Sequence, residues 1–129
     1  MGEYKSIIPV GMRPRPDMHE KIVAKIMAEY FKSDVSFIKC SSVTTPDILV
    51  IRTRQYWEIK NIRGNSKRTI QNNLRNADNQ SKKVIISLFR TDMTSDQATG
   101  RVKECLRNSR VQLESIIVVT KNRKIIVIK

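Results

Sequence analysis

The sequence predicts a single domain of the α/β class, with a mixed central β-sheet flanked by helices. A chain of 129 residues is long enough to bury one hydrophobic core but too short for two. Short apolar blocks, such as residues 84–86 and 116–119, indicate buried strands. Segments with apolar residues at spacings of three and four alternate with these blocks and indicate amphipathic helices. Hydrophobic residues make up 40% of the chain, which excludes a disordered basic tail.

The chain begins with a segment rich in Pro, Gly and Arg. Residues 1–16 are predicted to form a lead-in arm or linker, and residues 17–129 to form the folded domain. Apolar residues then recur every three to four positions, which predicts a first helix over residues 19–31. Asp17 is placed to accept hydrogen bonds as its N-cap.

Three strand candidates follow the first helix. Residues 35–38 form a short one, and residues 48–52 and 56–60 form two more. A tight turn at Thr53 and Arg54 would join the second and third strands. The natural interpretation of this stretch is a β-hairpin.

A second helix is predicted after the polar turn at residues 63–65. Ser66 can cap it, and the pattern continues to about Gln80. Its apolar side is thin and consists of Ile70, Leu74 and Ala77. The face opposite this apolar side is polar and basic.

The last third of the chain predicts a strand, a helix and a hairpin. Residues 84–88 have the pattern of a buried strand, and Thr94 or Ser95 can cap a third helix. Two further strands, at residues 116–120 and 124–128, close the domain. This order of helices and strands supports a mixed sheet between helical layers.

The charge of the chain is strongly basic. Lys and Arg number 25 against 12 Asp and Glu, which gives a formal charge of +13 and a pI near 10.2. A polyanionic partner is therefore expected, although basic charge also serves solubility in small proteins. Charge alone does not separate nucleic acid from acidic lipid or an acidic protein. A membrane is the weaker choice, because no membrane-spanning run and no basic amphipathic helix with exposed aromatic residues is present.

The cysteine and histidine content limits the chemistry. Cys40 and Cys105 are far apart in the sequence and lack the spacing of a zinc site, so two reduced thiols are expected. His19 is the sole histidine, which leaves no histidine pair for catalysis or for a metal site. Residues 1–10 lack a signal peptide, so we expect a domain that works in a cytoplasm, reached if necessary as the cargo of a larger secreted protein.

Three ionisable residues form the main candidate site. Glu58 and Lys60 are two positions apart in a predicted strand, so their side chains share one face, while Ile59 points to the other. Asp47 precedes the neighbouring strand. The carboxylates and a backbone carbonyl can hold Mg²⁺ or Mn²⁺, with Zn²⁺ as a further choice, and Lys60 could orient or deprotonate a water. A plain salt bridge between Glu58 and Lys60 is the simpler alternative.

The hairpin register decides whether these three side chains meet. A two-residue turn at Thr53 and Arg54 fixes that register. The predicted pairs are Arg52 with Gln55, Leu49 with Glu58, and Asp47 with Lys60. A one-residue slip would move the strand's side chains to the opposite face.

Residues 17–90 resemble the PD-(D/E)XK nuclease superfamily. The resemblance rests on Pro46-Asp47 before an apolar strand, on Trp57-Glu58-Ile59-Lys60 in the next strand, and on an upstream helix that opens with Glu20. It implies a restriction-endonuclease-like core in which Asp47, Glu58 and Glu20 bind the metal and Lys60 is catalytic. Stabilisation of the helix N-terminus is the alternative role of Glu20.

A narrower resemblance covers the middle of the chain. The segments GNSKRTI (64–70), NLR (73–75) and QS (80–81) look like the C-terminal nuclease domains of contact-dependent growth inhibition and related polymorphic toxins. This implies a toxin that cuts tRNA or DNA in the cytoplasm of a neighbouring bacterial cell and is delivered within a larger surface protein. It also implies a cognate immunity protein. The resemblance slightly favours tRNA over DNA.

The polar face of the second helix is the candidate substrate-binding surface. Arg68, Asn72, Arg75 and Asn79 fall at intervals of four, three and four, which places them in one stripe. Lys67 and Arg68 at the helix start could meet a phosphate, and the resemblance adds Gln80. A solvated helix face has the same pattern. The rival function is a non-catalytic, basic module that binds nucleic acid without cutting it.

Overall fold

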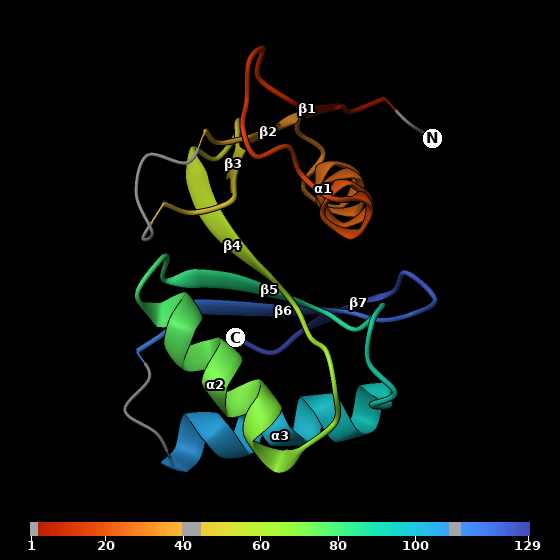
Figure 1. Ribbon diagram of the computed structural model, residues 1–129, viewed down its shortest axis with the longest axis vertical. Coiled ribbons are helices and arrows are strands. Elements are labelled where there is room, and N and C mark those ends of the chain that lie inside the picture. Colours follow the sequence, from red (N-terminus) through yellow and green to blue (C-terminus); the bar gives the residue numbers. More distant parts are fainter. Residues whose placement is uncertain (1–2, 40–44, 109–111) are drawn as a thin grey trace.

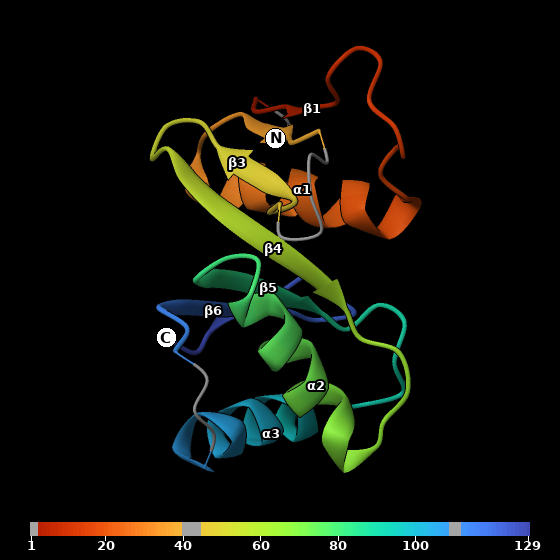
Figure 2. The same cartoon turned by 60° about the vertical axis from the view of Figure 1, so that its left-hand side comes forward.

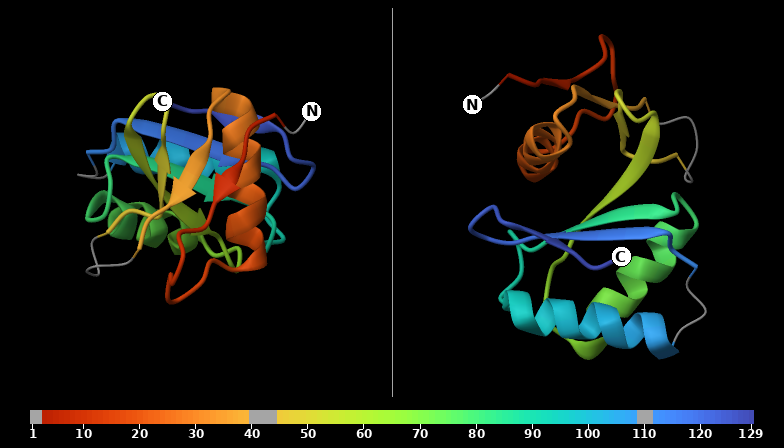
Figure 3. Two further views of the ribbon diagram at one scale, coloured as in Figure 1. Left: turned by 90° about the horizontal axis from the view of Figure 1, so that it is seen from above. Right: turned by 180° about the vertical axis from the view of Figure 1, so that it is seen from behind.

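A computed structural model describes residues 3–39, 45–108 and 112–129 of the chain. Within these residues a seven-stranded mixed sheet has the spatial order β1-β2-β3-β4-β5-β6-β7, the same as the order along the chain. Helix α1 lies on one face of the sheet, and α2 and α3 lie on the other (Figure 1, Figure 3). The predicted class, a mixed sheet flanked by helices, is confirmed.

The first part of the described fold contains one helix and three short strands. They are β1 (Ser6–Ile7), α1 (Met18–Phe31), β2 (Val35–Phe37) and β3 (Ile48–Val50). Strand β1 runs parallel to β2, and β2 is antiparallel to β3. The predicted first helix and its cap are confirmed, because the Asp17 side chain accepts a hydrogen bond from the Glu20 N–H at 2.8 Å.

The second part contains the long strand and the remaining helices. They are β4 (Gln55–Asn61), α2 (Lys67–Asp78), β5 (Lys83–Ser87), α3 (Ser95–Asn108), β6 (Ser115–Val119) and β7 (Ile125–Val127). Strands β4, β5 and β6 are parallel to one another, and β7 returns antiparallel to β6. The crossovers of the parallel strands are α2 and α3, which is why both helices cover the same face.

The helix ends refine the sequence predictions. Helix α2 ends at Asp78, two residues before the predicted end. Ser66 occupies the N-cap position, but its hydroxyl pairs with the Thr69 hydroxyl at 2.9 Å and not with a helix N–H. Thr94 caps α3, because its side chain accepts a hydrogen bond from the Gln97 N–H at 3.2 Å.

The sheet separates two hydrophobic clusters. One lies between the sheet and α1 and includes Met27, Trp57 and Ile85. The other lies between the sheet and the two remaining helices and includes Leu74 and Ile86. The predicted apolar side of α2 is confirmed, because Ile70, Leu74 and Ala77 are all completely buried.

The N-terminal segment is part of the fold. Ser6–Ile7 pairs with β2, and Met12 is buried in the α1 cluster. The predicted lead-in arm, residues 1–16, therefore packs against the domain at β1 and at Met12. A two-residue strand and one isolated apolar residue carry no periodic signal, so sequence patterns do not reveal this packing.

Candidate active site

Strand β4 changes its pairing partner at the candidate site. Its first half pairs with β3 through Gln55, Tyr56 and Trp57, and its second half pairs with β5 from Glu58 to Asn61. Strand β3 therefore departs from β4 at the position of Glu58 (Figure 2). The main-chain groups on that side of β4 need other partners from this point on.

The alternation of side chains along β4 follows the prediction. Trp57 is 3% exposed, and its ring centroid lies 5.6 Å from that of Phe31 on α1. Glu58 and Lys60 project to the opposite face, where their side chains form an ion pair with 3.1 Å between Lys60 Nζ and Glu58 Oε2. The salt bridge that was the simpler alternative is therefore present, although the Glu58 partner is buried and not on the surface.

The predicted hairpin register is wrong by two residues. Val50 pairs with Gln55, and Leu49 pairs with Tyr56, so the connection contains four residues and not two. Arg54 in this turn has the left-handed φ of 59°, which Gly or Asn usually adopts, so the turn type has no clear sequence signal. A shift of two residues preserves the face of every side chain. Asp47 therefore stays on the predicted face but lies beside Glu58 and not beside Lys60.

Asp47 is fixed against β4 by two hydrogen bonds. Its N–H donates to the Trp57 carbonyl at 3.2 Å, and its carboxylate Oδ2 accepts from the Ile59 N–H at 2.8 Å. The side chain of Asp47 thus replaces the main chain of β3 as the partner of Ile59. Its carboxyl is also close enough to the carboxyl of Glu58 to raise the pKa of Glu58.

The two carboxyls form a pair that is shielded from water. Glu58 is 3% exposed, its Oε1 has no hydrogen-bond partner among the described residues, and Asp47 is partly buried. Burial raises the pKa of Glu58 to about 8, the Asp47 carboxyl contributes to this rise, and the Lys60 ammonium opposes it. Burial also raises the pKa of Asp47, against the hydrogen bond from Ile59. The pair therefore favours holding a proton unless a further positive charge compensates it.

Gln80 reaches the site from the end of α2. Its Oε1 accepts a hydrogen bond from Lys60 Nζ at 2.7 Å, so the ammonium lies between Gln80 and Glu58. The Gln80 N–H donates to the Ala77 carbonyl at 2.8 Å, which fixes the turn that follows the helix. Gln80, which the resemblance added to the candidate site, therefore lies near it and contacts Lys60.

Glu20 stabilises the start of α1, which is one of the two roles that the sequence left open, whereas metal binding stays a prediction. Its Oε1 accepts from the Asp17 N–H at 3.0 Å, which completes a capping box at the start of α1. The same carboxyl is close enough to Asp47 to interact with it electrostatically. Burial is the main cause that raises the pKa of Glu20, and the charge of Asp47 adds to it. Within the described residues, no three or more His, Cys, Asp or Glu side chains converge closely enough to form a metal site by themselves.

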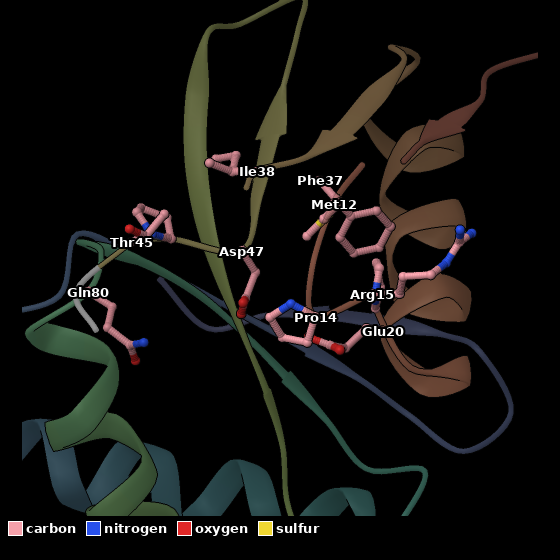
Figure 4. Close-up of a pocket in the computed structure, with 11 residues that line it drawn as sticks. Met12, Pro14, Arg15, Glu20, Phe37, Ile38, Thr45, Asp47 and Gln80 are labelled. Carbon is pink, nitrogen blue, oxygen red and sulfur yellow. The ribbon is translucent and has the colours of Figure 1, made fainter. Parts of the chain in front are cut away.

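A pocket of about 210 Å³ opens beside the carboxyl pair. Glu20 and Asp47 extend toward the same part of it, and Pro14 lies beside them (Figure 4). Gln80 approaches from the opposite side. The remaining lining residues come from the N-terminal segment, the end of β2 and the start of β3, namely Met12, Arg15, Pro16, Phe37, Ile38, Thr45 and Pro46. Sequence reasoning missed this wall of the site.

The polar stripe on α2 is exposed along its whole length. Arg68, Asn72, Arg75 and Asn79 all have exposed side chains. Twelve helical residues span roughly 18 Å, so the start of α2 is far from the end that carries the turn to Gln80 (Figure 1). Arg68 lies in the first turn of α2 and Arg75 in its last turn, so a phosphate contact of Arg68 stays a prediction. The side chain of Lys67 is outside the described part of the structure.

Two other expectations concern cysteines and membranes. Cys105 is buried, and Cys40 is outside the described residues. None of the helices in the described ranges is long and apolar enough to cross a membrane.

Comparison with known proteins identifies the family. The family model of the contact-dependent growth inhibition CdiA C-terminal domain matches residues 44–125. Among solved structures, the CdiA-CT/CdiI toxin and immunity complex from Burkholderia pseudomallei contains a similar chain, with 17% identity, 98% coverage of each chain and a TM-score of 0.66. At this identity the likeness concerns the fold. No curated protein matches the chain. Because the family match spans more than half of its residues, this chain belongs to the contact-dependent growth inhibition CdiA C-terminal domain family.

Proposed function

We propose that this chain is a growth-inhibiting toxin domain that cleaves phosphodiester bonds in nucleic acid with the help of a divalent metal ion. The observation that carries the proposal is the shielded pair of Asp47 and Glu58 with the Lys60 ammonium 3.1 Å from Glu58. Burying two adjacent carboxyls and a neighbouring cation costs free energy. Such an arrangement, with raised pKa values, is typical of a functional site. Membership in the growth-inhibition family supports a toxic role.

The carboxyl pair fits a hard divalent cation. Glu58 Oε1 is a buried oxygen without a partner among the described residues, and the Asp47 carboxyl is adjacent. Mg²⁺ and Mn²⁺ prefer oxygen ligands, and Mg²⁺ commonly takes only one or two carboxylates from the protein. Asp47 and Glu58 would hold the ion, with Glu20 as a further carboxylate near Asp47. When bound, the ion would neutralise the pair, polarise a substrate phosphate and acidify a water.

The other residues of the site have distinct roles in this proposal. Lys60 supplies positive charge and hydrogen-bond donors at the place where a phosphate would meet the carboxyls. Gln80 holds the Lys60 ammonium through the 2.7 Å hydrogen bond, so its part is to position the lysine and not to bind substrate directly. The exposed Arg75 on α2 would contact the nucleic-acid backbone farther from the reacting phosphate.

The substrate and partners follow from charge and from the family. The formal charge of +13 suits a polyanion, and we propose tRNA as the substrate, with DNA as the alternative. The solved relative was captured with an immunity protein, and we propose that a cognate immunity protein blocks this domain in the producing cell. We further propose that the domain is delivered within a larger surface protein and acts in the cytoplasm of a target bacterium.

The test is cleavage of total tRNA and of plasmid DNA, each with Mg²⁺, Mn²⁺, Zn²⁺ or excess EDTA. The parent protein should cleave one substrate in the presence of a metal, and Glu58→Ala should lose this activity. The control is Glu114→Ala, which removes a carboxylate that is 64% exposed and distant in sequence from the pair. Binding without cleavage under every metal would replace the proposal with the non-catalytic module.

A further inference from the structure

Tyr56 lies on the same face of β4 as Glu58 and Lys60. Alternate residues of a strand are roughly 6.6 Å apart, so Tyr56 is the neighbour of Glu58 on this face in the direction away from Lys60. Tyr56 is 50% exposed, whereas its neighbour Trp57 is packed against α1. A half-exposed aromatic ring next to the carboxyl pair has no role in the hydrophobic clusters of the described residues.

The ring lies on the face of the hairpin that α1 does not cover. In Figure 2, α1 lies behind β3 and β4, and their opposite face is turned toward the reader. Leu49 pairs with Tyr56 in register and is only partly buried, so it extends the apolar surface beside the ring. Cross-strand neighbours of this kind lie about 5 Å apart. The two side chains together offer apolar surface on the face of the sheet that carries Glu58.

The backbone of Tyr56 is held in place by the turn that carries Gln80. The Ser81 hydroxyl donates to the Tyr56 carbonyl at 3.0 Å and accepts from the Lys83 N–H at 3.1 Å. Gln80, one residue earlier, accepts from Lys60 Nζ. One turn therefore ties the backbone of Tyr56 and the ammonium of Lys60 to each other, so the ring is anchored on the strand that carries the reacting groups.

Exposed cations on the elements next to Tyr56 favour a nucleotide as the ligand of its ring. Arg54 is exposed in the turn that joins β3 to β4, and Arg75 is exposed on α2. Arg52 in the same turn is directed to the Lys32 carbonyl at the end of α1 and is not one of them. Cations bind the phosphates of a nucleic-acid strand, and an aromatic ring stacks on a base whatever its identity. A base inside a duplex is already stacked on its neighbours, so only an unpaired base is free to cover a protein side chain.

We propose that Tyr56 stacks on an unpaired nucleobase adjacent to the cleaved phosphate, which makes a loop, an end or a single strand the substrate of this domain. The inference rests on the proposed nuclease function and specifies which part of a nucleic acid it attacks. It applies to RNA and DNA alike, because every base has a face that can stack.

The experiment measures binding without cleavage, in the Glu58→Gln protein with EDTA. Short single-stranded RNA and DNA containing 2-aminopurine, and the same strands paired with their complements, are the probes. Binding of the single strand should quench the 2-aminopurine fluorescence. Adding Tyr56→Ala should abolish the quenching and weaken single-strand binding by about 5- to 150-fold, with about a twofold effect or less on the duplex. Comparing the RNA and DNA probes shows which of them the site prefers.

Two further variants separate stacking from damage to the fold. Tyr56→Phe keeps the ring and should retain both quenching and affinity. Tyr30→Ala is the matched control, because Tyr30 is 45% exposed but lies on α1. Unchanged single-strand binding by Tyr56→Ala overturns the stacking proposal, as does an equal loss for single strand and duplex. If the parent cleaves normally in either case, the nuclease function stands, whereas no binding of any nucleic acid refutes both.

Discussion

Replacing Glu58 with Gln should make this protein more stable at neutral and alkaline pH while removing its activity. Glu58 is 3% exposed, and burial together with Asp47 raises its pKa to about 8 from the ordinary value of 4.5. The folded state therefore favours the protonated carboxyl. The stability that this group contributes is fully present below pH 4.5 and is lost as the pH rises to 8. The loss is about 3 kcal/mol at pH 7 and approaches ~5 kcal/mol above pH 8. An amide side chain does not ionise, so the Glu58→Gln variant avoids this loss.

Urea unfolding at pH 5, 7 and 9 in EDTA measures this difference directly. The free energies of unfolding of the parent and of Glu58→Gln should be within about 1 kcal/mol at pH 5, and the variant should gain as the pH rises. Glu114→Gln, at a carboxylate that is 64% exposed, should show no such trend. Mg²⁺ or Mn²⁺ should narrow the difference, because only the parent can bind it through the ionised pair. A difference that stays constant from pH 5 to pH 9 would refute the account of the shielded carboxyl pair.

Two further predictions concern the surroundings of the site. Gln80→Ala removes the 2.7 Å hydrogen bond to Lys60 and should lower kcat about tenfold, shift the pH-rate profile and leave KM nearly unchanged. Steady-state kinetics beside the exposed control Asn76→Ala measures this, and an unchanged pH profile would contradict the positioning role. Arg68→Ala and Arg75→Ala should each weaken nucleic-acid binding and reduce the salt dependence of log K by about one phosphate contact. Titrations at several salt concentrations test this, and an unchanged slope would show that the α2 stripe does not contact phosphates.

Local sequence patterns were sufficient for the elements and for one face of β4. The alternation of Glu58, Ile59 and Lys60 placed the two ionisable side chains on one face, as the structure confirms. The apolar spacing of α2 likewise identified its buried side. Such patterns depend on the period of one helix or strand, and that period is a property of the local chain.

The hairpin register and the approach of distant residues depended on the tertiary structure. In the four-residue turn Arg54 has a left-handed conformation, and no Gly or Asn in the sequence indicates such a turn. The resulting register places Asp47 opposite Glu58 and not opposite Lys60. The hydrogen bond between Gln80 and Lys60 depends on how α2 packs beneath the sheet. Contacts of this kind join residues from separate elements, so they carry no periodic signal in the sequence.

The sequence by itself determined the fold class, the basic charge and the residues of the candidate site. Only the tertiary structure placed the site at the point where β4 leaves β3 and joins β5. The physical reason is that β3 departs from β4, so the Ile59 N–H donates to the Asp47 carboxylate in place of a main-chain carbonyl. This hydrogen bond holds the Asp47 carboxylate in a partly buried position beside Glu58. The same packing makes the N-terminal segment one wall of the pocket. It also leaves Tyr56 exposed on the face of the sheet that carries Glu58. Burial and proximity are set by the whole chain, and they give these carboxyls their raised pKa values.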